Sequence, residues 1–294
     1  MNKLNIIVTG AGGGGIGEQV IKALRNGVND YYIVSTDIRK DSIASRLGDE
    51  FCVLPSSNSP EYISELIKYC DMYNCKIIIP GSEPELIKIA SNIDLFQSAG
   101  IFIPINNIDL IRLCNDKLEF NKFLKNNNFS FCETLKIEGN LIPSKLENFP
   151  YVLKPSSGSG SRDVYLVQSY SELKNILKYL GIENNFLLQE YVGNPCNEYT
   201  VGILCTPNQG YINHVILNRD LSLGLSIKQS VLNKSDQSIL GDRLVVSTGI
   251  SQGKFVTNSK IDEAVFKIVQ LLNPISSINL QCRIHNNEVF IFKI

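Results

Sequence analysis

Short apolar runs alternate with amphipathic segments along the first third of the chain. Residues 4–9 and 31–35 are apolar runs of strand length. Residues 16–24 and 62–73 carry apolar side chains at the three- and four-residue spacing of an amphipathic helix. Strands that alternate with helices favour a parallel sheet with helices on its faces. We therefore expect an α/β, Rossmann-like domain over residues 1–105.

The remaining chain follows another pattern. Helical spacing covers residues 109–124 and 262–272, whereas segments of strand character dominate from residue 186 onward. Strands that follow one another in this way favour an α+β arrangement with antiparallel sheets. We expect a first subdomain over residues 106–192 and a C-terminal subdomain over residues 193–294.

Composition excludes several classes of protein. The chain has 294 residues, of which 44% are hydrophobic and 19% charged, as in a globular protein rather than a disordered one. A net charge of −1 argues against nucleic acid or an anionic membrane as a partner, and no apolar run is long enough to span a bilayer. The eight cysteines form no CxxC pair, and two histidines cannot supply a typical zinc site, so we expect reduced thiols and a cytoplasmic protein.

A glycine-rich run, TGAGGGGIG at residues 9–17, follows the first predicted strand and opens a helix. The pattern GxGxxG fits it in two registers, and Asp37 ends the second strand about 20 residues further on, where an acid that binds ribose would stand. Glycines let an anion approach the backbone, and the helix N-terminus attracts it. An NAD-dependent oxidoreductase is therefore one hypothesis, and a tight turn without a ligand is the other.

A second group of residues suits a nucleoside triphosphate. Lys117 opens a predicted helix, and Lys154 ends a strand before the Ser/Gly loop at residues 156–161. Lysines act as point charges on phosphates, and the amides of such a loop can fold over them. The extended segment 190–192 offers adenine a backbone donor and acceptor, and the carboxylate of Glu198 can accept ribose hydroxyl protons.

In this order and spacing, these residues resemble the ATP-grasp superfamily, most closely its carbamoyl phosphate synthetase large-subunit-like branch of carboxylate–amine ligases. The run IPGSEPEL at residues 79–86 is similar to the pre-ATP-grasp domain. The resemblance implies an enzyme that activates a carboxylate with ATP as an acyl phosphate, which an amine then attacks. It implies ATP and Mg²⁺ as cofactors and small-molecule carboxylate and amine substrates, and it allows a homodimer.

The resemblance also implies a role for individual residues. Lys117 and Lys154 would contact the ATP phosphates, and Arg219 would be the catalytic residue that stabilises the transferring phosphoryl group. Gln281 would be a magnesium ligand. The other ATP-binding residues implied by the resemblance lie in the lid loop, the adenine hinge and the ribose site: Ser156, Ser157, Gly158, Ser159, Gly160, Gln189, Glu190, Tyr191, Val192 and Glu198.

The last residues depart from the family pattern, whose sheet ends in a Glu-x-Asn-Pro-Arg run with two magnesium ligands. Here the run is VFIFKI at residues 289–294, and a three-residue loop at residues 286–288 predicts that Lys293 pairs with Gln281. Lys293 then stands at the position of the family's metal-binding Glu. At about 4 Å and an effective dielectric constant of about 20, a unit charge pair is worth roughly 4 kcal/mol, so the lysine opposes a metal there.

Three hypotheses stay open. The first is the ATP-dependent ligase, with a C-terminal subdomain that we expect to be truncated and a metal site that we expect to be impaired. The second is a nucleotide-binding protein without turnover, which Lys293 favours. The third is the NAD-dependent oxidoreductase based on residues 10–17 and Asp37.

Overall fold

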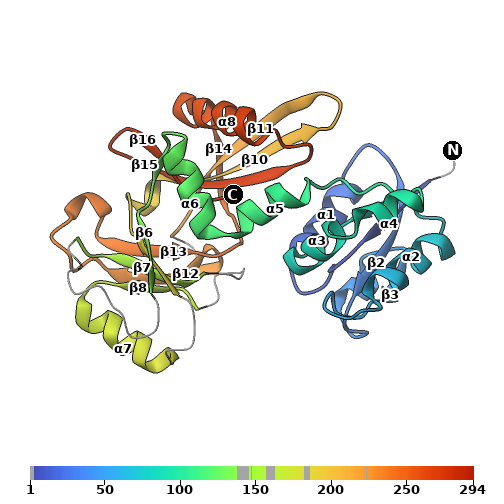
Figure 1. Ribbon diagram of the computed structural model, residues 1–294, viewed down its shortest axis with the longest axis horizontal. Coiled ribbons are helices and arrows are strands. Elements are labelled where there is room, and N and C mark those ends of the chain that lie inside the picture. Colours follow the sequence, from blue (N-terminus) through green and yellow to red (C-terminus); the bar gives the residue numbers. More distant parts are fainter. Residues whose placement is uncertain (1–2, 138–145, 147, 157–162, 182–185, 223) are drawn as a thin grey trace. The chain divides into compact units, whose positions relative to one another are not determined.

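The computed structural model describes residues 3–137, 146, 148–156, 163–181, 186–222 and 224–294. The chain divides into two compact units, Met1–Ile108 and Asp109–Ile294, and each is described by itself (Figure 1). The boundary predicted from the sequence lies between residues 105 and 106.

The first unit is built on a four-stranded parallel sheet in the order β3-β2-β1-β4. The helices and strands alternate along the chain, as the hydrophobic pattern predicts. In chain order they are β1 (Leu4–Val8), α1 (Ile16–Arg25), β2 (Tyr31–Asp37), η1 (Ile43–Arg46), β3 (Glu50–Val53), α2 (Tyr62–Met72), β4 (Ile77–Ile79), α3 (Glu83–Ala90) and α4 (Ile93–Ser98).

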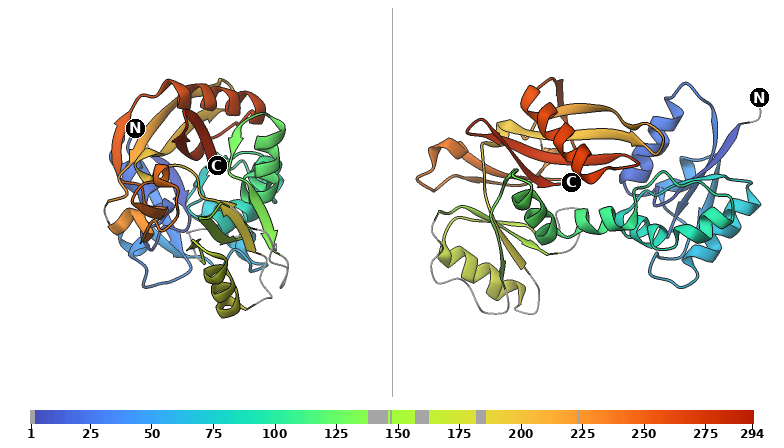
Figure 2. Two further views of the ribbon diagram at one scale, coloured as in Figure 1. Left: turned by 90° about the vertical axis from the view of Figure 1, so that its left-hand side faces the viewer. Right: turned by 45° about the horizontal axis from the view of Figure 1, so that its top comes forward.

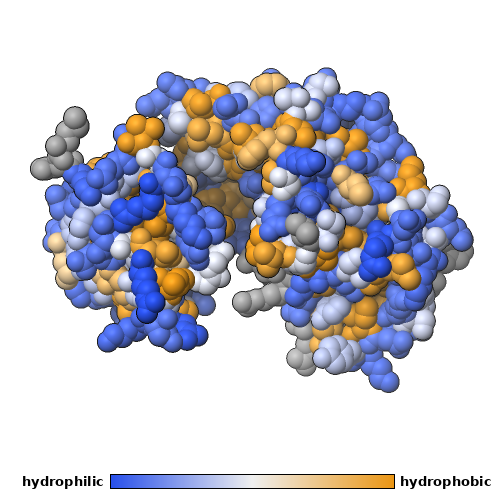
Figure 3. Space-filling model, turned by 180° about the vertical axis from the view of Figure 1, so that it is seen from behind, coloured by the Kyte–Doolittle hydropathy of each residue, from blue (hydrophilic) through white to orange (hydrophobic). Residues whose placement is uncertain are grey.

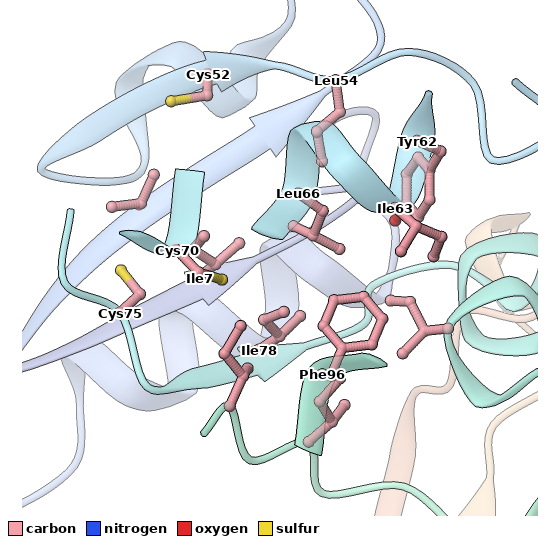
Figure 4. Close-up of a cluster of buried hydrophobic side chains, with 14 residues drawn as sticks. Ile7, Cys52, Leu54, Tyr62, Ile63, Leu66, Cys70, Cys75, Ile78 and Phe96 are labelled. Atoms are coloured by element: carbon pink, nitrogen blue, oxygen red, sulfur yellow. The ribbon is translucent and has the colours of Figure 1, made fainter. Parts of the chain in front are cut away.

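Both faces of this sheet are buried. Ile7 of β1 packs in one hydrophobic cluster with Leu66 of α2 and Phe96 of α4 (Figure 4). Its neighbour Ile6 belongs to a second cluster, which contains Ile21 of α1. Successive residues of a strand point to opposite faces, so a sheet covered on both sides needs apolar residues in unbroken runs. This requirement explains the continuous apolar run that marks β1 in the sequence.

The second unit contains a six-stranded sheet in the order β14-β11-β10-β15-β16-β5, in which only the β16–β5 pair is parallel. Two helices pack on one of its faces (Figure 2). The elements are α6 (Lys117–Asn126), β5 (Ser130–Phe131), β10 (Glu198–Thr206), β11 (Gly210–Arg219), β14 (Gly253–Val256), α8 (Ser259–Leu272), β15 (Ile278–His285) and β16 (Glu288–Lys293).

Two smaller sheets complete the second unit. A four-stranded antiparallel sheet has the order β6-β9-β7-β8, and β12 pairs with β13. The remaining elements of this unit are α5 (Ile108–Asn115), β6 (Thr134–Ile137), β7 (Tyr151–Pro155), β8 (Tyr165–Val167), α7 (Tyr170–Leu180), β9 (Phe186–Glu190), η2 (Pro195–Asn197), η3 (Gly224–Ser226), β12 (Ile227–Leu232), η4 (Ser238–Leu240) and β13 (Arg243–Ser247).

The helical stretch predicted over residues 109–124 consists of two helices, α5 and α6, and the second begins at Lys117, where a helix start was predicted. The break falls at Asp116, whose backbone is extended (φ −87°, ψ 99°). Its carboxylate accepts hydrogen bonds from the backbone N–H groups of Leu118 and Glu119, both at 3.0 Å. An aspartate in this position satisfies amides that have no partner inside the helix. The new helix therefore starts at Lys117.

Within the described residues, no helix combines the length and apolar character that crossing a bilayer requires. Hydrophilic side chains cover much of the face seen in Figure 3, with apolar ones scattered among them. All eight cysteines are free thiols, and six of them are buried. The fold class is the predicted one, a parallel α/β unit followed by an α+β unit with antiparallel sheets.

Candidate functional site

Three lysines from separate elements of the second unit form what we call the lysine cluster: Lys117, Lys154 and Lys293. Lys117 is the first residue of α6, and its Nζ donates to the carbonyl oxygens of Pro155 at 3.2 Å and Ser156 at 3.4 Å. Lys154 lies next to these carbonyls on β7. Burial, followed by the positive charge of Lys117 and then that of Lys293, lowers the pKa of the Lys154 ammonium to about 8.

A neutral chain of hydrogen bonds holds Lys154. Its Nζ donates to Oε1 of Gln189 on β9 at 2.7 Å, and Nε2 of Gln189 donates to Oγ1 of Thr134 at 3.0 Å. Gln189 is buried on β9, which pairs with β7, the strand that carries Lys154. An amide oxygen orients an ammonium group but leaves its charge uncompensated. Among the residues that the structure describes, Lys154 has no carboxylate in ion-pair contact.

Lys293 reaches its position through a bulged hairpin. The chain turns through two residues, Asn286 and Asn287, because His285 pairs with Glu288. A shift of register between Gln281 and Cys282 then brings Lys293 opposite Gln281, which confirms the predicted pair by another route. Residues directly opposite each other in an antiparallel pair lie on the same face of the sheet. Gln281 and Lys293 are therefore neighbours.

The residues around this pair do not fit a magnesium ion. Magnesium prefers oxygen ligands, above all carboxylates. In the described part of the chain, no group of three or more His, Cys, Asp and Glu residues could hold a metal ion. The neighbour of Gln281 is a cation, which repels a divalent ion.

A second group, which we call the arginine–glutamate cluster, consists of Glu198, Arg219 and Arg283. Glu198 is 1% exposed, and its Oε1 accepts from Nη1 of Arg219 at 3.0 Å. Its Oε2 accepts from Nε of Arg283 at 2.9 Å and from Nη2 at 2.8 Å. Both carboxylate oxygens thus have cationic donors. The ribose role of Glu198 stays a prediction.

Arg219 is equally occupied by the protein itself. It donates to Oγ of Ser247 at 3.0 Å and to the carbonyl oxygens of Thr248 and Ile250, both at 2.9 Å. Its side chain is buried, and burial lowers the pKa of its guanidinium group. In the described residues, Nε of Arg219 is buried without a hydrogen-bond partner. The predicted catalytic role of Arg219 therefore also stays a prediction.

The sequence pattern did not single out Arg283, which contacts the segment predicted to bind adenine. Its guanidinium carbon lies 4.6 Å from the centroid of the Tyr191 ring, and Nη1 donates to the carbonyl oxygens of Val192 at 3.2 Å and Gly193 at 3.3 Å. A cation over an aromatic face is attracted by the ring. Arg283 therefore fixes the segment predicted to bind adenine. The available signal was a charged residue between the apolar residues Cys282 and Ile284 at the end of a predicted strand.

The predicted adenine hinge lies at the end of β9. The N–H of Glu190 donates to the carbonyl of Glu133 at 2.8 Å, and that of Tyr191 to the carbonyl of Pro150 at 3.2 Å. Tyr191 and Val192 are buried, and burial raises the pKa of the Glu190 carboxyl. Binding of adenine here stays a prediction. Five residues of the predicted lid loop, Ser157, Gly158, Ser159, Gly160 and Ser161, lie outside the described residues.

The glycine-rich loop of the first unit is bound by the protein's own acids. The N–H of Gly12 donates to Oδ2 of Asp37 at 2.9 Å, and the N–H of Gly14 donates to Oε2 of Glu18 at 2.9 Å. An anion at these amides would have to displace a carboxylate. This arrangement favours the tight turn over a dinucleotide site.

Comparison with known proteins agrees with the two units. Residues 114–279 match the family model described as an ATP-grasp domain, and residues 6–105 match that of a PylC-like, N-terminal domain. A carbamoyl-phosphate synthase of Methanobrevibacter smithii is 26% identical over 157 residues, which are 49% of this chain and 41% of that protein. An uncharacterized protein of Mycoplasma genitalium is 31% identical over 103 residues, which are 34% of this chain and 33% of that protein. The chain thus matches less than half of these curated relatives.

Solved structures share the fold over nearly the whole chain. An L-amino acid ligase from Bacillus licheniformis has a TM-score of 0.69 at 14% identity, covering 100% of this chain and 66% of that one. N5-carboxyaminoimidazole synthetase from Staphylococcus aureus, complexed with ADP, has a TM-score of 0.68 at 16% identity, covering 99% of this chain and 70% of that one. These likenesses confirm the fold. The ATP-grasp model matches more than half of the residues of this chain, and the chain therefore belongs to the ATP-grasp family.

Proposed function

We propose that the chain is an ATP-dependent ligase that activates a small carboxylate as an acyl phosphate for attack by an amine. Membership of the ATP-grasp family supports ATP as the nucleotide. The observation that carries the proposal is the lysine cluster, in which three cations converge from α6, β7 and β16. Like charges are brought together in this way where an anion is to be bound.

In phosphoryl transfer, the main task of the protein is to place positive charges around the phosphates. Phosphoryl transfer depends on positioning and on neutralising the charge of the phosphates, and no protein nucleophile is required. In the proposal, Lys117 and Lys154 contact the phosphates beside the end of β7, where the Ser/Gly loop begins at Ser156. The hydrogen bonds from Lys154 through Gln189 to Thr134 keep that ammonium in place.

The other parts of the proposal follow from the family. Tyr191 and Val192, fixed by Arg283, would flank the adenine, and the substrates would be a small-molecule carboxylate and an amine. The free thiols suit a reducing compartment, so we propose a cytoplasmic location. A homodimer remains part of the proposal.

Binding and turnover test this function. The whole chain should bind ATP in calorimetry, and it should release ADP when given its carboxylate and amine from a panel of both. Lys154→Ala should weaken ATP binding by at least about tenfold, because one of the phosphate contacts is lost. Lys254→Ala, an exposed lysine on β14, is the matched control and should bind as the parent does. No ATP binding by the parent, or unchanged binding by Lys154→Ala, would overturn the proposal.

One observation favours a second candidate, a nucleotide-binding protein without turnover. Lys293 stands beside Gln281, and the residues there do not fit magnesium. This candidate shares the ATP binding of the ligase but predicts no ADP release with any carboxylate and amine of the panel. ADP release that depends on both substrates would exclude it.

A further inference from the structure

We propose that the ammonium group of Lys293 supplies the positive charge that a divalent metal would otherwise bring to the phosphates, so that this chain binds nucleoside polyphosphates without a divalent cation. The inference rests on the ATP binding proposed above and goes beyond it, because it concerns how charge is neutralised at the site.

The first step is the position of Lys293. It ends β16, and the bulge in the β15–β16 hairpin turns it to the face of Gln281. Without the register shift, Phe292 would stand opposite Gln281 and Lys293 would lie on the other face, since side chains alternate along a strand. The bulge thus directs a cation to this point. Bulges re-aim side chains in this way beside functional sites.

The second step concerns the residues that lie near Lys293. Helix α6, which begins at Lys117, packs against β5 and β16. Lys117 in turn bonds to the carbonyls of Pro155 and Ser156, beside Lys154. Three elements that are far apart in the sequence therefore bring their lysines to one place, and the charges of Lys117 and Lys293 act on Lys154.

The third step is the balance of charge. In the part of the chain that the structure describes, neither Lys154 nor Lys293 forms an ion pair with a carboxylate. Like charges held close together repel one another, and an anion with several charges relieves that repulsion. A divalent metal would add to the repulsion, and the amide of Gln281 is a weak ligand for it. A polyphosphate without metal fits this site better than its metal complex.

The experiment is calorimetric titration of the whole chain with ATP, once with EDTA and once with excess MgCl₂. The parent should bind ATP at least as tightly with EDTA as with excess MgCl₂, because the site fits the polyphosphate without metal better. Lys293→Glu should bind at least about tenfold more weakly in EDTA, because a cation is replaced by an anion, and should recover with MgCl₂ because a Glu–Gln pair can hold the metal. Lys254→Glu, an exposed lysine at the opposite edge of the same sheet, is the matched control and should behave as the parent.

Thermal unfolding of each variant checks that it folds. If Lys293→Glu does not fold, Lys293→Gln removes the charge alone and should weaken binding in EDTA by at least about threefold. ATP binding by the parent only with MgCl₂, or Lys293 variants that bind as the parent does in EDTA, would overturn this inference and leave the proposed function standing. Absence of ATP binding in both buffers would instead overturn the proposed function.

Discussion

Lys154 is a residue whose surroundings oppose its own charge. Burial is the largest cause of its lowered pKa of about 8, and Lys117 and Lys293 add to it. The neutral partner Gln189 orients the ammonium without compensating it. A lysine with a pKa far below its usual value of about 10.4 changes its charge just above neutral pH. A phosphate contact made by this group must therefore depend on pH.

The affinity for ATP should fall as the pH rises through about 8. The ammonium form binds the anion and the amine form does not, so raising the pH from about 7 to about 9 should weaken binding by about tenfold. Calorimetry across this range measures the effect. Lys154→Arg stays charged and should give a much flatter profile. A flat profile for the parent would show that Lys154 does not contact the phosphates.

Single residues also show where sequence reasoning stops. Lysines near a Ser/Gly loop could be singled out because their chemistry is local. The partners of Glu198 could not, since Arg219 and Arg283 lie 21 and 85 residues away in the sequence. A carboxylate that suits a ribose hydroxyl suits a guanidinium group equally well. Only the pairing of β10 with β11 and β15 shows that the two guanidinium groups reach this carboxylate.

Among the elements, the β15–β16 hairpin departs from its predicted structure in two ways, and the two departures cancel in their effect on the register. The sequence predicts a three-residue loop, whereas the turn uses Asn286 (φ 47°) and Asn287 (φ 70°) alone. A two-residue turn with both φ values positive matches the twist of the strands, and asparagine tolerates it. The shorter loop would have moved the register by one residue, and the bulge at Gln281 restores it. Turn chemistry is local and could have been predicted, but a bulge is set by packing.

At helix α6, Asp116 sets both the start of the helix and the place of Lys117. Asp116→Ala removes an acceptor for two backbone N–H groups, so it should lower the free energy of unfolding by about 1 kcal/mol. Urea denaturation followed by circular dichroism measures this loss. Asp116→Asn keeps the cap and should lose less than half as much. Equal losses in the two variants would mean that the carboxylate's charge, not the cap, is what matters.

At the scale of the whole molecule, the alternation of strands and helices was enough to predict the parallel sheet of the first unit. Its strands are buried on both faces and therefore stand out as apolar runs. The six-stranded sheet was harder to predict from the sequence, because β5 is two residues long and β14 is exposed throughout. Neither strand has a hydrophobic pattern of its own. Both are held by the neighbours with which they pair.

The division into two units leads to a prediction for the intact chain. All three members of the lysine cluster belong to the unit Asp109–Ile294. Ligand that binds only the native state stabilises it by about 2.7 kcal/mol at one hundred times its dissociation constant. ATP should therefore slow amide hydrogen exchange in β7, β9 and the start of α6, and leave the glycine-rich loop at residues 10–17 unchanged. Exchange followed by mass spectrometry compares the segments. Protection centred on residues 10–17 would place the nucleotide on the first unit and favour the NAD-type hypothesis over the lysine cluster.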